Sequence, residues 1–262
     1  MSRGLGDVYK RQADDRTNES VARTLEFALS DYCIAQMAKA LGKTTDYEDL
    51  MRRAKNYRYL YNPKTKLFQA RNADGCWAGE HSGFTEGANW TYQFCVMQDV
   101  QGLIDLMGGN ESFAAALDNV FDNGHYRHDN EPGHHYVYLY NYCGRFDKAQ
   151  ERIPEILDTH YRNGADGLSG NDDCGQMSAW YLFSSLGFYT VTPASGEYAL
   201  GIPRFPSARV ELPHGKVLTV RAEGLKEHKH LPVILFNGKK LDAPFIAIRD
   251  LMKGGVLEFK AE

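Results

Sequence analysis

The feature that most restricts how this chain can fold is a run of ten residues at 170–179, Gly-Asn-Asp-Asp-Cys-Gly-Gln-Met-Ser-Ala. Two adjacent acids, Asp172 and Asp173, stand just ahead of an apolar and aromatic stretch with helical spacing, 180–188. We therefore expect both acids at or before a helix N-terminus, where the flanking glycines allow a tight turn. Carboxylates there can bind a cation, activate a water or cap the helix. Capping needs only one acid, so the doublet favours a functional role.

Composition excludes several classes of protein. The 262 residues carry a formal net charge of -4 and contain no basic run, so nothing indicates a nucleic-acid partner. No segment has the apolar length of a membrane span. The five cysteines form no CxxC pair, which argues against a dense disulfide framework and leaves the redox compartment open. The 16 Tyr, 13 Phe and 3 Trp suit stacking on sugar rings, although packing in a core accounts for most of them.

Apolar residues recur at helical spacing as far as residue 195 or so, and alternate as in strands beyond it. We predict helices over 18–41, 46–60, 90–107, 111–121, 134–142 and 146–160, with a kink or split at Pro154, and a further helix after the Asp doublet. We predict strands over 208–212, 217–221, 231–236 and 256–259. The chain is thus expected to be mainly α, with a helical region over 13–195 and a smaller antiparallel β region over 196–262.

The first twelve residues, MSRGLGDVYKRQ, match nothing that follows them. They resemble a translated sequencing-adapter scar, so we treat residues 1–12 as non-native and leave them out of the fold argument. On this interpretation the chain is part of a longer polypeptide, and the missing signal peptide says nothing about localisation.

Three polar loops, each directly before a predicted helix, carry the candidate chemistry: 84–90, 128–135 and 171–173. A pair of carboxyl groups on opposite sides of a sugar is the usual device for breaking a glycosidic bond. Glu86 lies near Trp77 and Trp90 in the sequence, and we expect a low-dielectric pocket that raises its pKa, as a general acid requires. The alternative is a carboxylate that only stabilises a helix start.

Asn130 and Glu131 supply hard oxygen ligands, which suit calcium better than a transition metal. The alternative is a loop that caps the next helix. His134 and His135 are adjacent, so on a helix they point about 100° apart, which is poor for joint zinc chelation. One of them could hydrogen-bond a substrate hydroxyl, and a buried structural role is equally consistent with the sequence.

The segments 85–87 (Thr-Glu-Gly), 130–135 (Asn-Glu-Pro-Gly-His-His) and 170–181 resemble glycoside hydrolase family 92, a family of calcium-dependent, inverting exo-α-mannosidases. Shorter segments at 24–28, 186–189 and 196–198 also resemble that family, and all the segments occur in the family's order, so the resemblance covers about 19–262. It implies an (α/α)6 barrel with β elements packed against it. The chain would supply about half of the barrel helices and a β-rich C-terminal segment, so we do not expect it to be a complete enzyme alone.

The resemblance also implies roles for individual residues. Glu86 would be the general acid and Asp173 the base that activates water, with Asp172 beside it. Calcium would be held by Asn130, Glu131 and Asp173. The substrate contacts would come from Trp77, Trp90, His134, His135 and Asn171. Family members often carry Asp where this chain has Asn171, so the sharing of the base and water-positioning roles stays open.

The function that we expect is release of terminal α-linked mannose, with inversion, from an oligosaccharide or a glycoprotein glycan. The resemblance implies a periplasmic or secreted enzyme. One alternative is a sugar-binding or scaffold module without turnover, and a weaker one is a zinc hydrolase using His134 and His135. Linkage specificity and oligomeric state are not indicated by the sequence.

Overall fold

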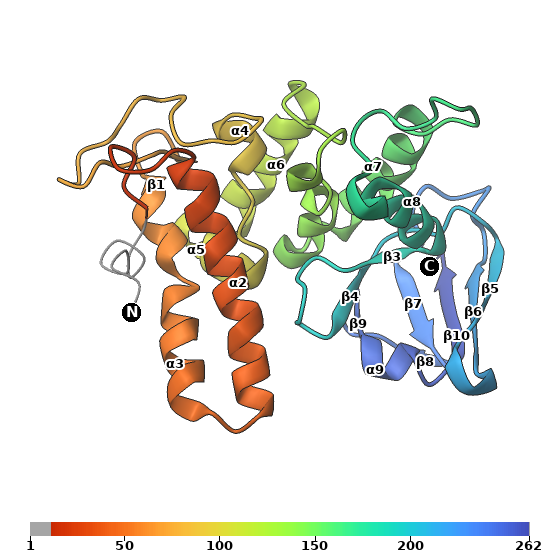
Figure 1. The fold of residues 1–262 in the computed structure, drawn as a ribbon. Coiled ribbons are helices and arrows are strands. Elements are labelled where there is room, and N and C mark those ends of the chain that lie inside the picture. Colours follow the sequence, from red (N-terminus) through yellow and green to blue (C-terminus); the bar gives the residue numbers. More distant parts are fainter. Residues whose placement is uncertain (1–11, 262) are drawn as a thin grey trace. The chain divides into compact units, whose positions relative to one another are not determined.

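The computed structural model describes residues 12–261 (Figure 1). Contacts between residues divide the chain into two compact units. The first unit comprises Met1–Tyr126 with Pro193–Ser195, and the second comprises Arg127–Thr192 with Gly196–Glu262. The expected segments 13–195 and 196–262 divide the chain by secondary structure instead, so the later strands share a unit with helices of 127–192. Most of the expected N-terminal scar, residues 1–11, lies outside the described residues.

The first unit begins with a pair of helices, α2 (Ser20–Ala40) and α3 (Thr44–Arg53), that pack on each other. The expected helix over 18–41 is confirmed, and the chain turns after it at Gly42, whose φ of 70° favours glycine. The expected helix over 46–60 is shorter. It stops at Arg53 and is followed by a 3₁₀ helix, η1 (Asn56–Leu60).

The remainder of the first unit is more broken than the sequence pattern predicts. A short hairpin follows η1, formed by β1 (Tyr61–Asn62) and β2 (Leu67–Phe68). The single helix expected over 90–107 is wrong, because the segment forms α4 (Asn89–Tyr92), η2 (Met97–Asp99) and α5 (Val100–Leu106). The side chain of Asp99 accepts a hydrogen bond from the backbone N–H of Gly102 at 3.2 Å and so starts a new helix inside the apolar pattern.

The last helix of the first unit is α6 (Asn110–Asp122), close to the expected 111–121. Gly109, with a φ of 97°, takes the N-cap position, and Asn110 is the first residue of the helix.

Helices of the second unit surround a core of large aromatic side chains. They are η3 (Glu131–Gly133), η4 (Tyr136–Cys143), α7 (Phe146–Thr159), η5 (Asp173–Gly175) and α8 (Gln176–Leu186). The segment expected as a helix over 134–142 is mostly 3₁₀, and α7 runs through Pro154 without splitting. The side chains of Tyr138 and Trp180 are both fully buried.

Two sheets complete the second unit. The larger has the order β5 (Ser207–Glu211), β6 (Val217–Ala222), β10 (Gly255–Lys260), β7 (Val233–Phe236) and β8 (Lys239–Lys240). The smaller joins β3 (Phe188–Tyr189), β4 (Glu197–Leu200) and β9 (Phe245–Ala247), and the short helices are η6 (Pro213–Gly215) and α9 (Ile248–Leu251).

The larger sheet corrects one expectation. Strands were expected near each of β5, β6, β7 and β10, but β10 runs parallel to β6, with Leu257 opposite Val220. The β region is therefore mixed and not wholly antiparallel. Alternation of apolar and polar residues locates a strand and its buried face, but it carries no information on the direction of the neighbouring strand.

Buried amides fasten the strands to the helices of the second unit. The Nδ2 of Asn141, in η4, donates to the carbonyl oxygen of Leu200 at 2.7 Å. The Nε2 of Gln150, in α7, donates to the carbonyls of Gly201 and Leu231, each at 3.1 Å. These bonds satisfy polar groups that burial would otherwise leave unpaired.

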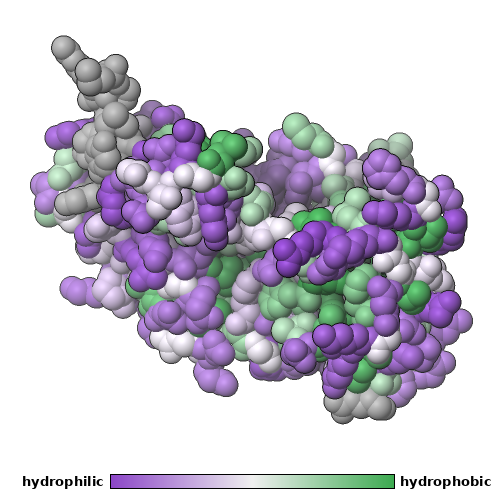
Figure 2. Space-filling view, turned by 90° about the horizontal axis from the view of Figure 1, so that it is seen from below, coloured by the Kyte–Doolittle hydropathy of each residue, from purple (hydrophilic) through white to green (hydrophobic). Residues whose placement is uncertain are grey.

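Hydrophilic residues cover much of the face shown in Figure 2, with hydrophobic residues visible between them. Helix α2 exposes a line of large apolar side chains at helical spacing: Phe27, Ile34, Met37 and Leu41. Among residues 12–261, no helix combines the length and apolar character needed to cross a bilayer.

Candidate active site

Two of the three predicted loops meet in the second unit. The backbone N–H of Asn171 donates to the carbonyl oxygen of Asp129 at 3.1 Å, and its Nδ2 reaches the Oδ1 of Asn130 at 3.5 Å. A Cβ on Gly170 would lie 2.2 Å from the Asp129 carbonyl oxygen, so only glycine fits at this crossing. The structure therefore brings the predicted residues Asn130 and Asn171 together.

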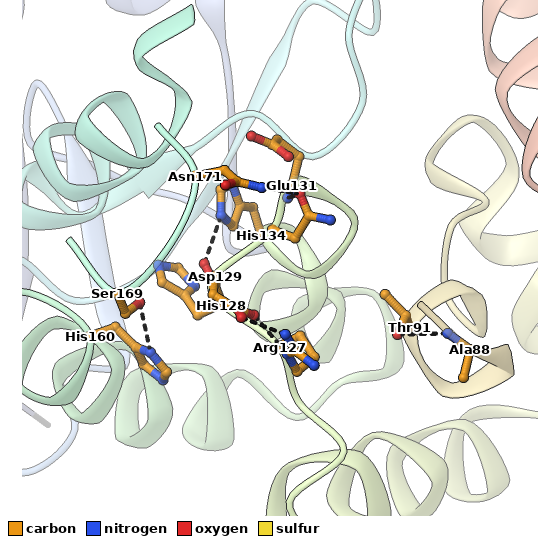
Figure 3. Close-up of polar contacts among 11 residues, drawn as sticks. Ala88, Thr91, Arg127, His128, Asp129, Glu131, His134, His160, Ser169 and Asn171 are labelled. Carbon is orange, nitrogen blue, oxygen red and sulfur yellow. Dashed lines mark hydrogen bonds and ion pairs between the residues drawn. The ribbon is translucent and has the colours of Figure 1, made fainter. Parts of the chain in front are cut away.

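A salt bridge braces the first of these loops. The guanidinium of Arg127 donates to both carboxylate oxygens of Asp129, at 2.7 and 2.5 Å (Figure 3). These hydrogen bonds lower the pKa of Asp129, so the pair stays ionised at neutral pH. The bridge was not anticipated from the sequence. It holds the backbone of Asp129, which contacts Gly170 and Asn171.

The side chain of Glu131 has one buried oxygen without a hydrogen-bond partner. Glu131 opens the 3₁₀ helix η3, and its backbone N–H donates to the Oδ1 of Asn130 at 3.2 Å. The buried oxygen is Oε1. Burying a carboxylate oxygen without a partner is unfavourable, so this atom fits a position that a cation completes. The preceding residue, Asn130, offers an amide oxygen, so the oxygen ligands of the two residues are of the kind that calcium takes.

No group of three or more His, Cys, Asp and Glu side chains within 12–261 is close enough to hold a metal by itself. The predicted ligands are the amide of Asn130 and the carboxylates of Glu131 and Asp173, so only two of the three belong to these four residue types.

The two acids of the doublet have different surroundings. Asp172 accepts two hydrogen bonds from Ser178, which lowers the pKa of Asp172, with the backbone N–H contributing most. Because Ser178 lies in the first turn of α8, Asp172 satisfies a backbone N–H at the start of that helix, whose N-cap residue is Gly175. Asp173 is the exposed first residue of η5. The next residue, Cys174, has a φ of 54°, so the turn after the doublet is strained.

Of the adjacent histidines, both are buried. The Nε2 of His134 lies 3.1 Å from the carbonyl oxygen of His128, and must donate to it (Figure 3). Burial lowers the pKa of His134, so the ring is neutral and its Nδ1 carries a lone pair. That Nδ1 is buried and has no hydrogen-bond partner, as expected for a group that receives a ligand hydroxyl. His135 packs edge-on against Tyr136.

Sequence analysis missed a buried aromatic cluster beneath these loops. His128 is fully buried, with its ring centroid 4.8 Å from that of His134, 5.1 Å from His160 and 4.4 Å from Trp180. Burial is the main cause that lowers the pKa of His128 to about 2. The indole N–H of Trp180 donates to the carbonyl of His134 at 2.8 Å. A lone histidine outside any periodic pattern gave no signal for this role.

Glu86 and both predicted tryptophans lie in the first unit. Glu86 is exposed, so the expected low-dielectric pocket around it is wrong for the described residues. Each tryptophan has another partner: the ring of Trp90 stacks on His125, with centroids 4.5 Å apart, and Arg71 lies over Trp77 at 3.8 Å. Glu86 has a φ of 50°, a left-handed conformation that is costly for glutamate and recurs at functional sites.

Residues 4–262 match the model of the Glycosyl hydrolase family 92 catalytic domain. The match begins inside the twelve residues that we expect to be foreign. A protein of Arthroderma benhamiae described as an uncharacterized secreted glycosidase is 28% identical over 92% of this chain and 35% of its own length.

Solved structures give the same assignment. The family GH92 α-mannosidase BT3965 from Bacteroides thetaiotaomicron is 39% identical, with a TM-score of 0.93, over 98% of this chain and 36% of that chain. The family GH92 inverting mannosidase BT2199 of the same species is 34% identical, with a TM-score of 0.87, over 94% of this chain and 37% of that one. The chain thus spans 35% to 37% of the length of these relatives. It belongs to glycosyl hydrolase family 92.

Proposed function

We propose that the protein releases terminal α-linked mannose from glycans with inversion of configuration. The observation that carries this proposal is the buried, unpartnered Oε1 of Glu131 next to the junction of Asn130 and Asn171, in a chain of family 92. The substrate class follows from the relatives, two of which are named as α-mannosidase or mannosidase. We also take the helices of the chain to be about half of an (α/α)6 barrel.

Asn130, Glu131 and Asp173 would hold the calcium ion. When bound, calcium would supply positive charge that orients sugar hydroxyl oxygens and favours a distorted ring. The unpaired Oε1 of Glu131 supports this assignment, since a cation would remove the cost of its burial. The neutral His134 would accept a hydrogen bond from a sugar hydroxyl through its Nδ1.

Asp173 would act as the general base. Its carboxylate is exposed, whereas both oxygens of Asp172 are engaged by Ser178. A base must accept a proton from water in the transition state, so the acid with its oxygens uncommitted to the helix is the better candidate. Asp172 would keep the doublet in place, and Asn171 would contact the sugar.

Glu86 would be the general acid that protonates the leaving oxygen, with Trp77 and Trp90 contributing to the sugar site. Inversion requires the carboxyl groups of Glu86 and Asp173 to stand about 6.5–9.5 Å apart in the working enzyme, because a water fits between base and sugar. The left-handed backbone of Glu86 supports a functional role, since such strain persists only where the surroundings impose it.

We further propose that the protein works outside the cytoplasm, on oligosaccharides or glycoprotein glycans. Its relative in Arthroderma benhamiae is described as secreted.

The decisive experiment uses the complete gene product that contains this chain and a set of α-linked mannobioses. We expect release of mannose, loss of the activity on chelation, recovery with calcium and not zinc, and β-mannose as the first product in proton NMR. Release of α-mannose first would contradict inversion, and activity that survives chelation would contradict the calcium role. Binding of mannosides without release, unchanged by Glu86→Gln, would favour the sugar-binding module instead.

A further inference from the structure

A chain of hydrogen bonds runs beneath the two loops of the site. The Nε2 of His128 lies 2.7 Å from the hydroxyl oxygen of Tyr161, and that hydroxyl donates to the carbonyl oxygen of Met177 at 3.0 Å. A hydroxyl has a single hydrogen, so the bond from His128 must be an N–H that donates to Tyr161. The order of donors is therefore fixed: His128 donates to Tyr161, and Tyr161 donates to the first turn of α8.

Each end of this chain of hydrogen bonds leads to a predicted site residue. Beyond Met177, the neighbouring Ser178 donates its N–H and its hydroxyl to Asp172, which precedes Asp173. On the other side, His128 precedes Asp129, whose carbonyl oxygen accepts from the backbone N–H of Asn171. The hydroxyl of Tyr161 is thus placed to fix the start of α8, and with it the acid doublet, against the loop that carries Asn130 and Glu131.

The surroundings of Tyr161 hold its ring independently of its hydroxyl. The ring stacks parallel to that of Trp180, with centroids 5.9 Å apart and planes inclined by 3°. Residues 161 and 168 form an antiparallel bridge, and the backbone N–H of Arg162 donates to the carbonyl of Gly167 at 2.9 Å. Removing the hydroxyl alone would leave this packing in place.

We propose that Tyr161 is a positioning residue for the hydrolysis, acting through its hydroxyl to set the place of Asp173 relative to Asn130 and Glu131. The effect of Tyr161 on turnover rests on the proposed function. Its effect on the position of the two loops rests only on the contacts just described. Tyr161 makes no contact with the reacting sugar in this proposal.

The test compares Tyr161→Phe with Tyr138→Phe in the complete gene product. Tyr138→Phe is the control, because the hydroxyl of Tyr138 also donates to α8, at Ser184 near the other end of the helix, at 2.9 Å. Tyr138 is fully buried whereas Tyr161 is half-buried, so the control substitution should disturb the packing at least as much. We expect Tyr161→Phe to lower kcat on mannobiose about 10–100-fold, as loss of a supporting hydrogen bond behind a metal site does. Tyr138→Phe should lower the melting temperature similarly but leave kcat within about threefold.

Hydrogen exchange supplies a second measurement that does not depend on turnover. In Tyr161→Phe the backbone amides of 171–178 should exchange about 10-fold faster than in the wild type, because local opening becomes easier by the loss of one bond. In Tyr138→Phe they should not. If the wild type hydrolyses no mannoside, the proposed function fails and exchange alone decides the positioning role. Equal kcat values for the two variants, or equal exchange rates where no turnover exists, would overturn it.

Discussion

Ser178 donates its backbone N–H and its side-chain hydroxyl to the two carboxylate oxygens of Asp172, at 2.9 and 2.8 Å. One residue thus occupies both oxygens of the first acid of the doublet. Its neighbour Asp173 is exposed and opens a separate 3₁₀ turn. Two acids that are equivalent in the sequence are therefore distinct in the fold.

The first prediction follows from this division. Asp173→Asn should lower kcat by about 10²–10⁴-fold, because it removes the proposed base. Asp172→Asn keeps one oxygen acceptor for Ser178 and should lower kcat much less, while it lowers the melting temperature. Steady-state kinetics and thermal unfolding of both variants check the prediction. If Asp172→Asn lowered kcat more than Asp173→Asn does, Asp172 would be the base and Asp173 the residue that supports it.

The second prediction concerns Glu131, whose Oε1 is buried without a hydrogen bond. Without calcium, Glu131→Gln should be as stable as the wild type or more stable, since a neutral amide costs less to leave unpaired in a buried position than a carboxylate oxygen does. Calcium at about 100 times its Kd should stabilise the wild type by about 2.7 kcal/mol and the variant far less. Thermal unfolding with and without calcium measures both effects. The exposed Glu227→Gln, in the same unit, is the control and should respond to calcium as the wild type does.

The third prediction uses the crossing of the two loops. Gly170→Ala places a methyl group 2.2 Å from the Asp129 carbonyl oxygen, so the loops must separate at a cost of about 1–3 kcal/mol. Urea unfolding should show this loss, and turnover should fall with it. Gly79→Ala is the control, because its nearest neighbour would be 4.0 Å away and its backbone is unstrained. A neutral Gly170→Ala would mean that the two loops are not held together as described.

The fourth prediction is a loss of stability in mild acid. Burial lowers the pKa values of His128, His134 and His160, so in the folded protein these rings stay neutral below the ordinary histidine pKa. In the unfolded chain they gain protons below about pH 6.5, so acid favours unfolding by up to about 1.4 kcal/mol per pH unit for each histidine.

The measurement is urea unfolding of the wild type and of His160→Gln between pH 7.5 and about pH 4.5, with chelator present. The free energy of unfolding should decrease with acid in both proteins, and less steeply in His160→Gln, which has one fewer site to titrate. If the free energy of unfolding fell equally steeply with acid in both proteins, His160 would make no contribution to the acid sensitivity.

Much of the helical framework could be predicted because its pattern is local. The spacing of Val21, Leu25 and Leu29 and the glycine at 42 are enough to predict α2. Prediction failed where a side chain interrupts an apolar pattern, as Asp99 does by capping α5. It failed again in the pairing of β6 with β10, which depends on contacts between segments far apart in the chain.

The candidate site was predicted in part for the same reason. Asn130, Asn171 and the acid doublet lie in short motifs, and two loops that carry them do meet. The different surroundings of Asp172 and Asp173 could not be read from adjacent letters, because they depend on Ser178. His128 opens one of the predicted polar loops, but Tyr161 belongs to no motif, and only the fold brings its hydroxyl oxygen to 2.7 Å from the Nε2 of His128.

The order of the larger sheet has a consequence for synthesis. Strand β10 is the last of the five to leave the ribosome, yet it lies between β6 and β7. Until it emerges, β5–β6 and β7–β8 are two hairpins with unpaired inner edges, which invite pairing with other nascent chains. A stop codon placed before β10 should therefore yield insoluble material.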